Sequence, residues 1–314
     1  MNLASPNDCV RLTRSLGYDS MKPKFLPDSK LVIYPEDEKP RLRMLEDLFS
    51  KWNQHLAENA SGFERHNIVF DGFYPYYFAK KQPKILFIGR DAYNMAGKNY
   101  IEEHYCHFRE GKHGTGPLDD QVYHSRILCV AYGIIKGFSN LCFPDWHNIP
   151  KASEIGRREF ASKDGISFAY MNLSKFDNAN RTTNADWPLI DAFIEHSTNG
   201  DRNFLEAEIN ILEPDVIITM NLENRIASLG KRKLIRSDPN ATCYWLNTDA
   251  HGCLLIDSWH FSASCKGDIT EIYEPIYEAI SRNYRCVKCG IEVSSRSHAL
   301  VLNCSKGGEH EWRY

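Results

Sequence analysis

The sequence predicts an α/β protein whose central, mostly parallel β-sheet is flanked by helices on both faces. Short apolar runs rich in β-branched residues recur along the chain, and each one stops at a polar residue or a glycine. Segments with apolar residues at helical spacing lie between these runs. This alternation is typical of a parallel sheet with helical crossovers.

Five apolar runs are the predicted strands. Runs that are apolar throughout are typical of parallel strands buried on both faces. The first run, residues 84–88, ends at Gly89. The others are residues 166–171, 216–220, 242–246 and 253–256.

Four helices are predicted where apolar residues recur three and four positions apart. In residues 41–58 the repeat includes Leu45, Phe49 and Trp52. The same spacing marks residues 123–138, 202–212 and 269–281. Residues 1–40 show no clear period, so we expect an irregular N-terminal extension, a main domain over 41–282 and a small tail over 283–314.

Composition indicates a folded intracellular protein. Hydrophobic residues make up 42% and aromatic residues 12% of the chain, enough for a sizeable core. No stretch reaches the roughly 18 apolar residues of a membrane span, and the first residues lack the apolar run of a secretory signal. The ten cysteines are therefore expected to be reduced thiols or metal ligands in the cytoplasm.

The strand ends are the predicted ligand site, because α/β sheets bind ligands outside the carboxyl ends of their parallel strands. Polar residues suited to chemistry follow three of the apolar runs. The rule selects residues 89–94, 172–177, Asn221 and 258–264.

Three of these segments resemble motifs of the uracil-DNA glycosylase superfamily. Residues 89–94 read Gly-Arg-Asp-Ala-Tyr-Asn, where the best-known branch has Gly-Gln-Asp-Pro-Tyr-His. Asn172 ends its apolar run as the family's asparagine does, and His260-Phe261-Ser262 matches the family's His-Pro-Ser. The resemblance covers about residues 65–282.

The resemblance implies a DNA-repair hydrolase that cleaves the N-glycosidic bond of uracil or a related modified pyrimidine in DNA, with no catalytic cofactor. Asp91 matches the carboxylate that positions and deprotonates water. His260 matches the donor to the anionic leaving base. Asn172 matches the amide that reads the base edge, and Tyr93 the residue that excludes the methyl group of thymine.

The same motifs imply the remaining substrate contacts. The family stacks an aromatic ring on the base shortly after the first motif, a position that Tyr105 or Phe108 could supply. Gly89 and Arg90 lie in the first motif and Ser262 in the third, so all three are expected to line the substrate site.

Departures from the family pattern keep a second function open. Arg90 could pair with Asp91 and lower its basicity, or hold a DNA phosphate. Residues 263–265 offer no large apolar wedge, so single-stranded or distorted DNA is the easier substrate. The alternative is a catalytically altered member that binds nucleic acid or a nucleotide without cleavage.

Each of these assignments also has a purely structural alternative. Asp91 could be a loop residue, Asn172 a turn cap and His260 a core histidine. An unrelated α/β hydrolase that converged on polar strand ends is a third possibility. The chain contains no Walker loop, no G-x-G-x-x-G and no G-x-S-x-G motif, which disfavours it.

The tail carries the pattern C-x2-C-x14-C-x5-H, formed by Cys286, Cys289, Cys304 and His310. This spacing predicts a structural zinc site that supplies the folding free energy of the short tail, with four unbound side chains as the alternative. The overall charge is −3, but residues 281–314 hold six Lys or Arg against three Glu, a local charge of +3. The tail therefore suits contact with DNA, including single strands.

Overall fold

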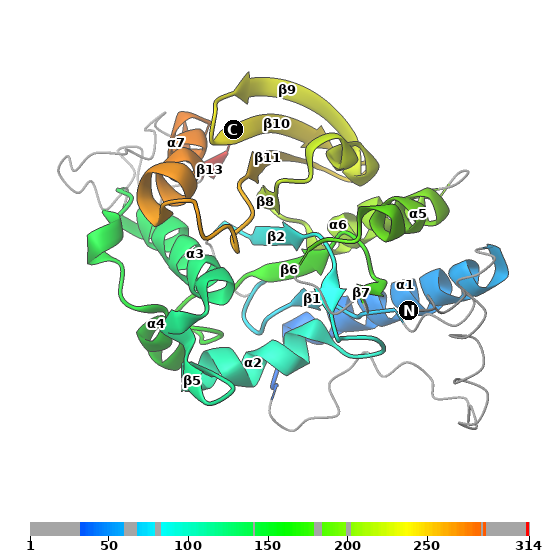
Figure 1. Ribbon diagram of the computed structural model, residues 1–314, viewed down its shortest axis with the longest axis horizontal. Helices are drawn as coiled ribbons and strands as arrows, with labels where there is room; N and C mark the ends of the chain where they lie inside the picture. The colour runs from blue at the N-terminus through cyan, green and yellow to red at the C-terminus, as the bar shows by residue number, and fades with distance from the viewer. Residues whose placement is uncertain are drawn as a thin grey trace, which may run out of the picture.

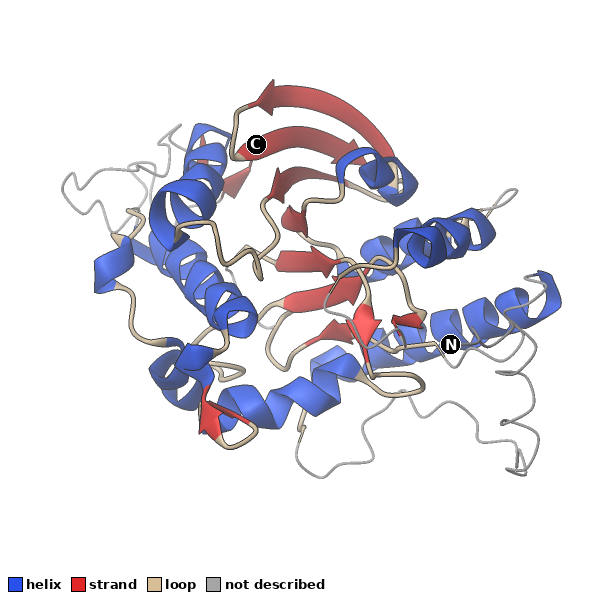
Figure 2. Cartoon of the chain, in the orientation of Figure 1, coloured by secondary structure: helices blue, strands red, loops and turns tan. Residues whose placement is uncertain are grey.

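A seven-stranded sheet runs through the middle of the protein in the computed structural model (Figures 1 and 2). The structure describes residues 32–59, 68–78, 83–140, 142–178, 184–198 and 202–283, and the backbone of 285–286 and 312–313. In spatial order the strands are β1 (Gly72–Phe73), β6 (Ala169–Asn172), β2 (Ile85–Gly89), β8 (Val216–Met220), β11 (Gly252–Ser258), β10 (Ala241–Asn247) and β9 (Lys231–Ser237).

The four strands β6, β2, β8 and β11 form the parallel centre of the sheet. Gly89 is in register with Asn172, and Ser258 with Met220. The last residues of these strands therefore meet at one edge of the sheet, as the sequence predicts for a ligand site.

One predicted parallel strand has the opposite direction. The run at 242–246 lies in β10, which pairs antiparallel with both β11 and β9. The four residues between β10 and β11 allow only a hairpin, because a parallel connection needs a crossover of a dozen residues or more. The sheet is therefore mixed, with antiparallel strands on both sides of its parallel centre.

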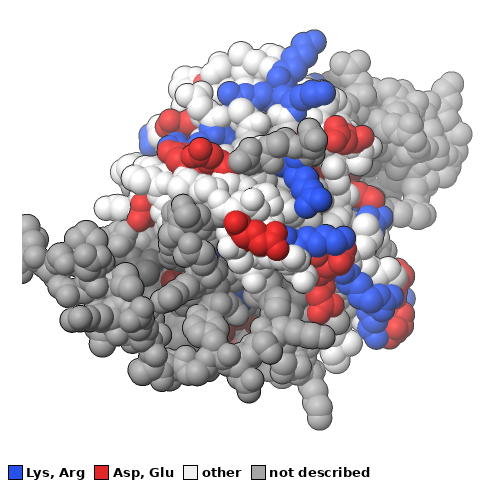
Figure 3. Space-filling model, turned by 90° about the vertical axis from the view of Figure 1, so that its right-hand side faces the viewer, with Lys and Arg blue, Asp and Glu red and all other residues white. Residues whose placement is uncertain are grey.

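β9 is an exposed, basic edge strand that apolar patterning does not reveal. Its exposed residues include Lys231, Lys233 and Arg236. Figure 3 shows basic side chains gathered at the top of the molecule, where Figure 1 places this edge of the sheet.

Helices cover both faces of the sheet. They are α1 (Lys39–Asn59), α2 (Tyr100–Glu110), α3 (Val122–Asn140), α4 (Ala152–Arg158), α5 (Trp187–Ser197), α6 (Phe204–Leu212) and α7 (Glu274–Asn283). The predicted helix at 269–281 begins as a π-helical turn, Asp268–Tyr273. None of the helices in the described part of the chain has the length and apolarity that crossing a bilayer requires.

Side chains alternate between the two faces of each strand, and each face of the sheet packs against its own set of helices. Ile85 and Phe87 of β2 pack with buried residues of α2, α3, α4 and α7. Their neighbours Leu86 and Ile88 point the other way and pack with α1, α5 and α6. Tyr34 joins the second core and donates a hydrogen bond to the Phe73 carbonyl, so the described end of the predicted extension belongs to the folded body.

A fully buried ionic network lies beneath the end of β6. Lys175 has no exposed surface, and its Nζ lies 2.6 Å from Asp71 Oδ1 and 2.8 Å from Glu208 Oε2. The Nζ also lies 5.4 Å from the ring centre of Phe49 and 5.6 Å from that of Trp52. Removing one partner of such a network leaves the others as uncompensated buried charges.

We expect Lys175→Met to lower the free energy of unfolding by about 3–5 kcal/mol, because Asp71 and Glu208 would lose their shared cation. Urea denaturation followed by circular dichroism measures the change. Lys51→Met is the matched control, since Lys51 and Asp47 form an exposed pair whose loss should cost about 0.5 kcal/mol. Equal losses in the two variants would contradict the prediction.

Candidate functional site

The loops after three parallel strands meet at one edge of the sheet. Arg90 and Asp91 follow β2, Asn172 ends β6, and His260 lies two residues beyond β11. We call these residues, with Gly89, the strand-end group. A short parallel pair, β3 (Ala92–Tyr93) with β7 (Asp177–Asn178), ties the first two loops together.

Asp91 is a partly buried carboxylate whose two oxygens have different surroundings. Its Oδ2 accepts hydrogen bonds from Asn178 Nδ2 at 3.0 Å and from the Asp186 backbone nitrogen at 3.3 Å. Within the described residues Oδ1 has no hydrogen-bond partner, so it can accept one from a water molecule. Burial raises the pKa of Asp91, and these hydrogen bonds and the charge of Arg90 offset part of the rise.

His260 is held as a neutral ring. Burial, together with the nearby charge of Arg90, lowers its pKa to about 4. Its Nδ1 accepts a hydrogen bond from the Ser262 backbone nitrogen at 3.2 Å and lies 2.6 Å from Ser262 Oγ. Because Nδ1 accepts, the single proton of the neutral ring belongs on Nε2, which becomes a donor. The ring stacks on Tyr123, with centres 5.5 Å apart.

Arg90 stacks on an aromatic ring and makes no ion pair with its neighbour. Its guanidinium lies 4.8 Å from the ring centre of Trp187, the first residue of α5, and Arg225 lies 4.1 Å from the same ring. Among the described residues Arg90 has no carboxylate within 4 Å, so the first of its two possible roles, a direct pair with Asp91, is not formed. Arg90 therefore acts on Asp91 and His260 through its field.

Asn172 is fully buried, and its amide is bonded to the protein. Its backbone nitrogen and Nδ2 donate to Asp71 Oδ2 at 2.6 and 3.3 Å. Its Oδ1 accepts a hydrogen bond from the Tyr170 hydroxyl at 3.3 Å. To pair with a base, the amide would have to exchange at least one of these partners.

Three tyrosines that the sequence did not single out surround this amide. Tyr170 stacks on Tyr100 with ring centres 4.1 Å apart, and its hydroxyl lies 2.5 Å from that of Tyr123. A Cβ atom at Gly89 would lie 2.2 Å from the Tyr170 hydroxyl, so glycine is required for this close approach. The spacing of Tyr170 and Asn172, on one face of a strand, is the signal that could have revealed Tyr170.

The other predicted contacts lie apart from the strand-end group or on its exposed side. Phe108 is 1% exposed, and its ring meets those of Tyr74 and Phe160 edge-on in the core. This packing leaves no open face on Phe108 for a base. Tyr105 is half-buried against the same core, whereas Tyr93 and Ser262 are exposed.

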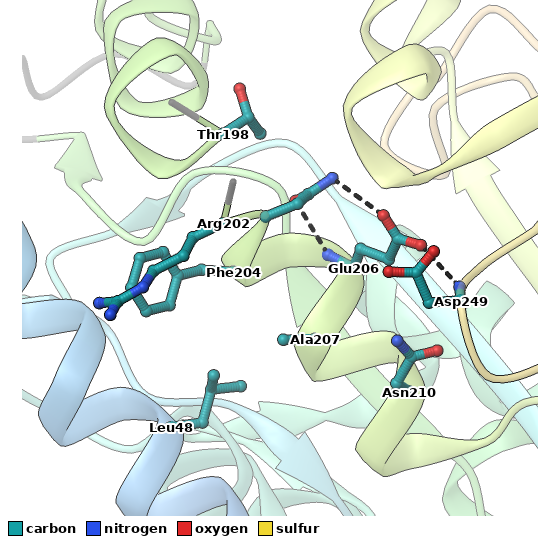
Figure 4. Close-up of a pocket in the computed structure, with 9 residues that line it drawn as sticks. Leu48, Thr198, Arg202, Phe204, Glu206, Ala207, Asn210 and Asp249 are labelled. Atoms are coloured by element: carbon teal, nitrogen blue, oxygen red, sulfur yellow. Dashed lines mark hydrogen bonds between the residues drawn. The ribbon is translucent and has the colours of Figure 1, made fainter. Parts of the chain in front are cut away.

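A hollow of about 450 Å³ beside α6 is separate from the strand-end group (Figure 4). Three of its polar lining residues bond to one another, whereas the buried Oδ1 of Asn210 has no hydrogen-bond partner among the described residues. Asn203 caps the helix by accepting a hydrogen bond from the Glu206 backbone nitrogen, and Glu206 Oε1 accepts one from the Asp249 backbone nitrogen. Figure 4 shows Glu206 bonded to Asp249 at one side of the hollow.

The predicted zinc ligands fall mostly outside the described residues. The backbone of β12 (Arg285–Cys286) pairs antiparallel with β13 (Trp312–Arg313), so Cys286 lies opposite Trp312. Cys289, Cys304 and His310 are not among the described residues.

Comparisons with known proteins identified no protein similar to this chain. Neither protein-family models, nor curated proteins, nor solved structures gave a match to the chain.

Proposed function

We propose that the protein hydrolyses the N-glycosidic bond of uracil or a related modified pyrimidine in DNA. One observation carries the proposal. At a single sheet edge, a carboxylate oxygen without a hydrogen-bond partner among the described residues accompanies a histidine whose Nδ1 accepts a hydrogen bond and whose lowered pKa favours the neutral ring. Bond cleavage between a base and deoxyribose needs this combination of a water acceptor and a donor to the departing base.

Each residue has a defined task in such a reaction. The glycosidic bond breaks, its electron pair leaves with the base, and the sugar gains oxocarbenium character. Asp91 holds a water molecule through Oδ1, favours the cationic sugar, and takes the proton as water adds. His260 donates from Nε2 to the oxygen on which the base accumulates negative charge. Arg90 adds a positive charge nearby.

Aromatic rings with cations against them support DNA as the partner. Arg90 lies against Trp187, and Lys266 Nζ lies 3.9 Å from the ring centre of Trp259, the residue before His260. Both tryptophans are half-buried, so part of each remains accessible to a partner, and aromatic residues flanked by cations are typical of single-strand binding grooves. Ala263, which follows the third motif, is too small to wedge a duplex open, so single-stranded DNA is the preferred form.

A structural zinc ion in the tail completes the proposal. The pairing of Cys286 with Trp312 brings the two ends of the tail sequence together. His310 lies two residues before Trp312 in the chain, so this closure favours ligands from both ends sharing one ion. The ion would stabilise the tail and would have no part in the cleavage step.

The buried amide of Asn172 favours a second candidate function. If its bonds to Asp71 and Tyr170 persist in the bound state, the protein would hold nucleic acid or a nucleotide without releasing a base. Tight binding of single-stranded DNA with no free base produced would identify this function.

We expect Asp91→Asn to lower the single-turnover rate of uracil release from single-stranded DNA by about 10²–10⁴-fold, because the amide cannot take a proton from water. Alkali-labile abasic sites in a labelled oligonucleotide measure the rate. Asp120→Asn, at an exposed position, is the control and should cleave at the parent rate. Undiminished cleavage by Asp91→Asn would remove Asp91 from the mechanism.

We expect His260→Ala to lower the same rate by about 10²–10³-fold, since the departing base would lose its donor. His147→Gln, at an exposed position, is the control. An unchanged rate in His260→Ala would return this histidine to a packing role.

The pH profile tests the protonation states. Asp91 must be ionised and His260 neutral, so acidification inactivates through both groups. Because the pKa of His260 is about 4, its own titration should leave kcat/KM unchanged through pH 6.5, and activity should fall at lower pH as Asp91, whose pKa burial raises, and His260 become protonated. Nuclear magnetic resonance titration of His260, assigned with His260→Gln, gives its pKa directly. A midpoint at the ordinary histidine value of about 6.5 would contradict the lowered pKa that keeps His260 neutral.

A further inference from the structure

Three histidines converge beyond the strand-end group. His104 and His107 belong to α2, and His113 belongs to the short strand β4 (Lys112–His113). One ring nitrogen from each lies within 4.8 Å of those of the other two. Sequence patterning did not select these residues, because they come from two elements with no recognised ligand spacing.

Local sequence explains the convergence. His104 and His107 are three residues apart in α2 and therefore share one face of the helix. Gly111 ends α2 in the left-handed conformation, with φ of 65°, and its backbone nitrogen bonds to the His107 and Phe108 carbonyls. This left-handed turn at Gly111 returns His113 of β4 to the last turn of the helix, and the hairpin of β4 with β5 (Gly116–Pro117) follows.

The cluster has polar atoms without partners. The Nδ1 atoms of His104 and His107 have almost no exposed surface and no hydrogen-bond partner among the described residues. The ring centres of His107 and His113 are 5.0 Å apart, and those of His104 and His107 are 5.9 Å apart. Buried imidazole nitrogens without partners are costly, and a metal ion would satisfy them.

We propose that His104, His107 and His113 bind one divalent metal ion of the zinc class. Imidazole nitrogen suits zinc, copper and nickel. Ligands about 2.05 Å from a tetrahedral zinc ion are about 3.4 Å apart, so modest ring rotations would close the observed spacing. Three protein ligands leave a fourth position for water, as in zinc sites that keep an open position.

His124 does not complete this ligand set. Its ring centre lies 4.6 Å from that of His104, but its Nε2 lies 3.4 Å from the Tyr100 hydroxyl. The site is distinct from the tail motif and does not rest on the proposed glycosylase activity.

The proposed ion would connect to the strand-end group through packing. His104 packs on Tyr100 with ring centres 4.2 Å apart, and Tyr100 stacks on Tyr170 beside Asn172. Binding would join the last turn of α2 to the hairpin and restrain the helix that carries Tyr100.

The test uses the full chain with Cys286→Ser and Cys289→Ser, which removes two of the four proposed ligands of the tail site. After equilibration with Zn²⁺ and removal of free metal, this parent should retain one more zinc per chain than the same chain with His104→Gln and His107→Gln. Zinc should also raise the Tm of the parent alone, because a ligand stabilises the state that binds it. Co²⁺ in the parent should give visible d–d absorption that the variant lacks.

His147→Gln in the same background is the matched control and should retain the parent's zinc, because its side chain lies outside the cluster. His113→Asn, in the half-exposed hairpin, provides a second variant if the double substitution disturbs the fold. Circular dichroism verifies folding in each case. Equal zinc content and equal Tm shifts in the parent and in a folded cluster variant would overturn the proposal.

Discussion

The Asp71 carboxylate holds together the part of the structure on which the candidate chemistry depends. One oxygen meets the buried Lys175, and the other accepts two hydrogen bonds from Asn172. The Val69 backbone nitrogen donates to the Lys175 carbonyl, so the segment before β1 and the loop after β6 are fixed to each other. Such a network tolerates little displacement, because each buried charge depends on the others for compensation. The end of β6 is therefore a rigid support for the loops that surround it.

The pKa values of Asp91 and His260 are shifted in opposite directions by similar surroundings. Asp91 and His260 both lie partly buried beside the charge of Arg90. Burial disfavours the charged form of each, which raises the pKa of the acid and lowers that of the base. Backbone donors then decide which atom stays available: Asp186 takes one oxygen of Asp91, and Ser262 takes one nitrogen of His260. These surroundings leave Asp91 with an oxygen that could accept a hydrogen bond from water and His260 with a nitrogen that could donate one.

Sequence reasoning found the α/β class, the helices on both faces and the edge of the sheet where polar residues gather, because these depend on local periodicity. It did not find the direction of β10, which is set by the four-residue hairpin to β11, or the strand β9, which is too charged and exposed to be recognised. Tyr100 and Tyr123, which contact Tyr170 from other elements, were missed because contact across elements leaves no periodic signal. Phe108 was a candidate to stack on the base because it follows the first motif, but its ring is buried in the core. Position after a motif does not determine whether a ring is exposed.

The basic edge strand β9 has a consequence for how copies of the protein meet. A terminal strand offers unpaired backbone groups to which another chain could add, and here Leu234 and Ile235 are also exposed. Lys231, Lys233 and Arg236 on the same strand would face their own counterparts if a second copy added there. Repulsion between the two lysines and their counterparts would oppose such addition at low ionic strength, and dissolved salt would weaken that repulsion.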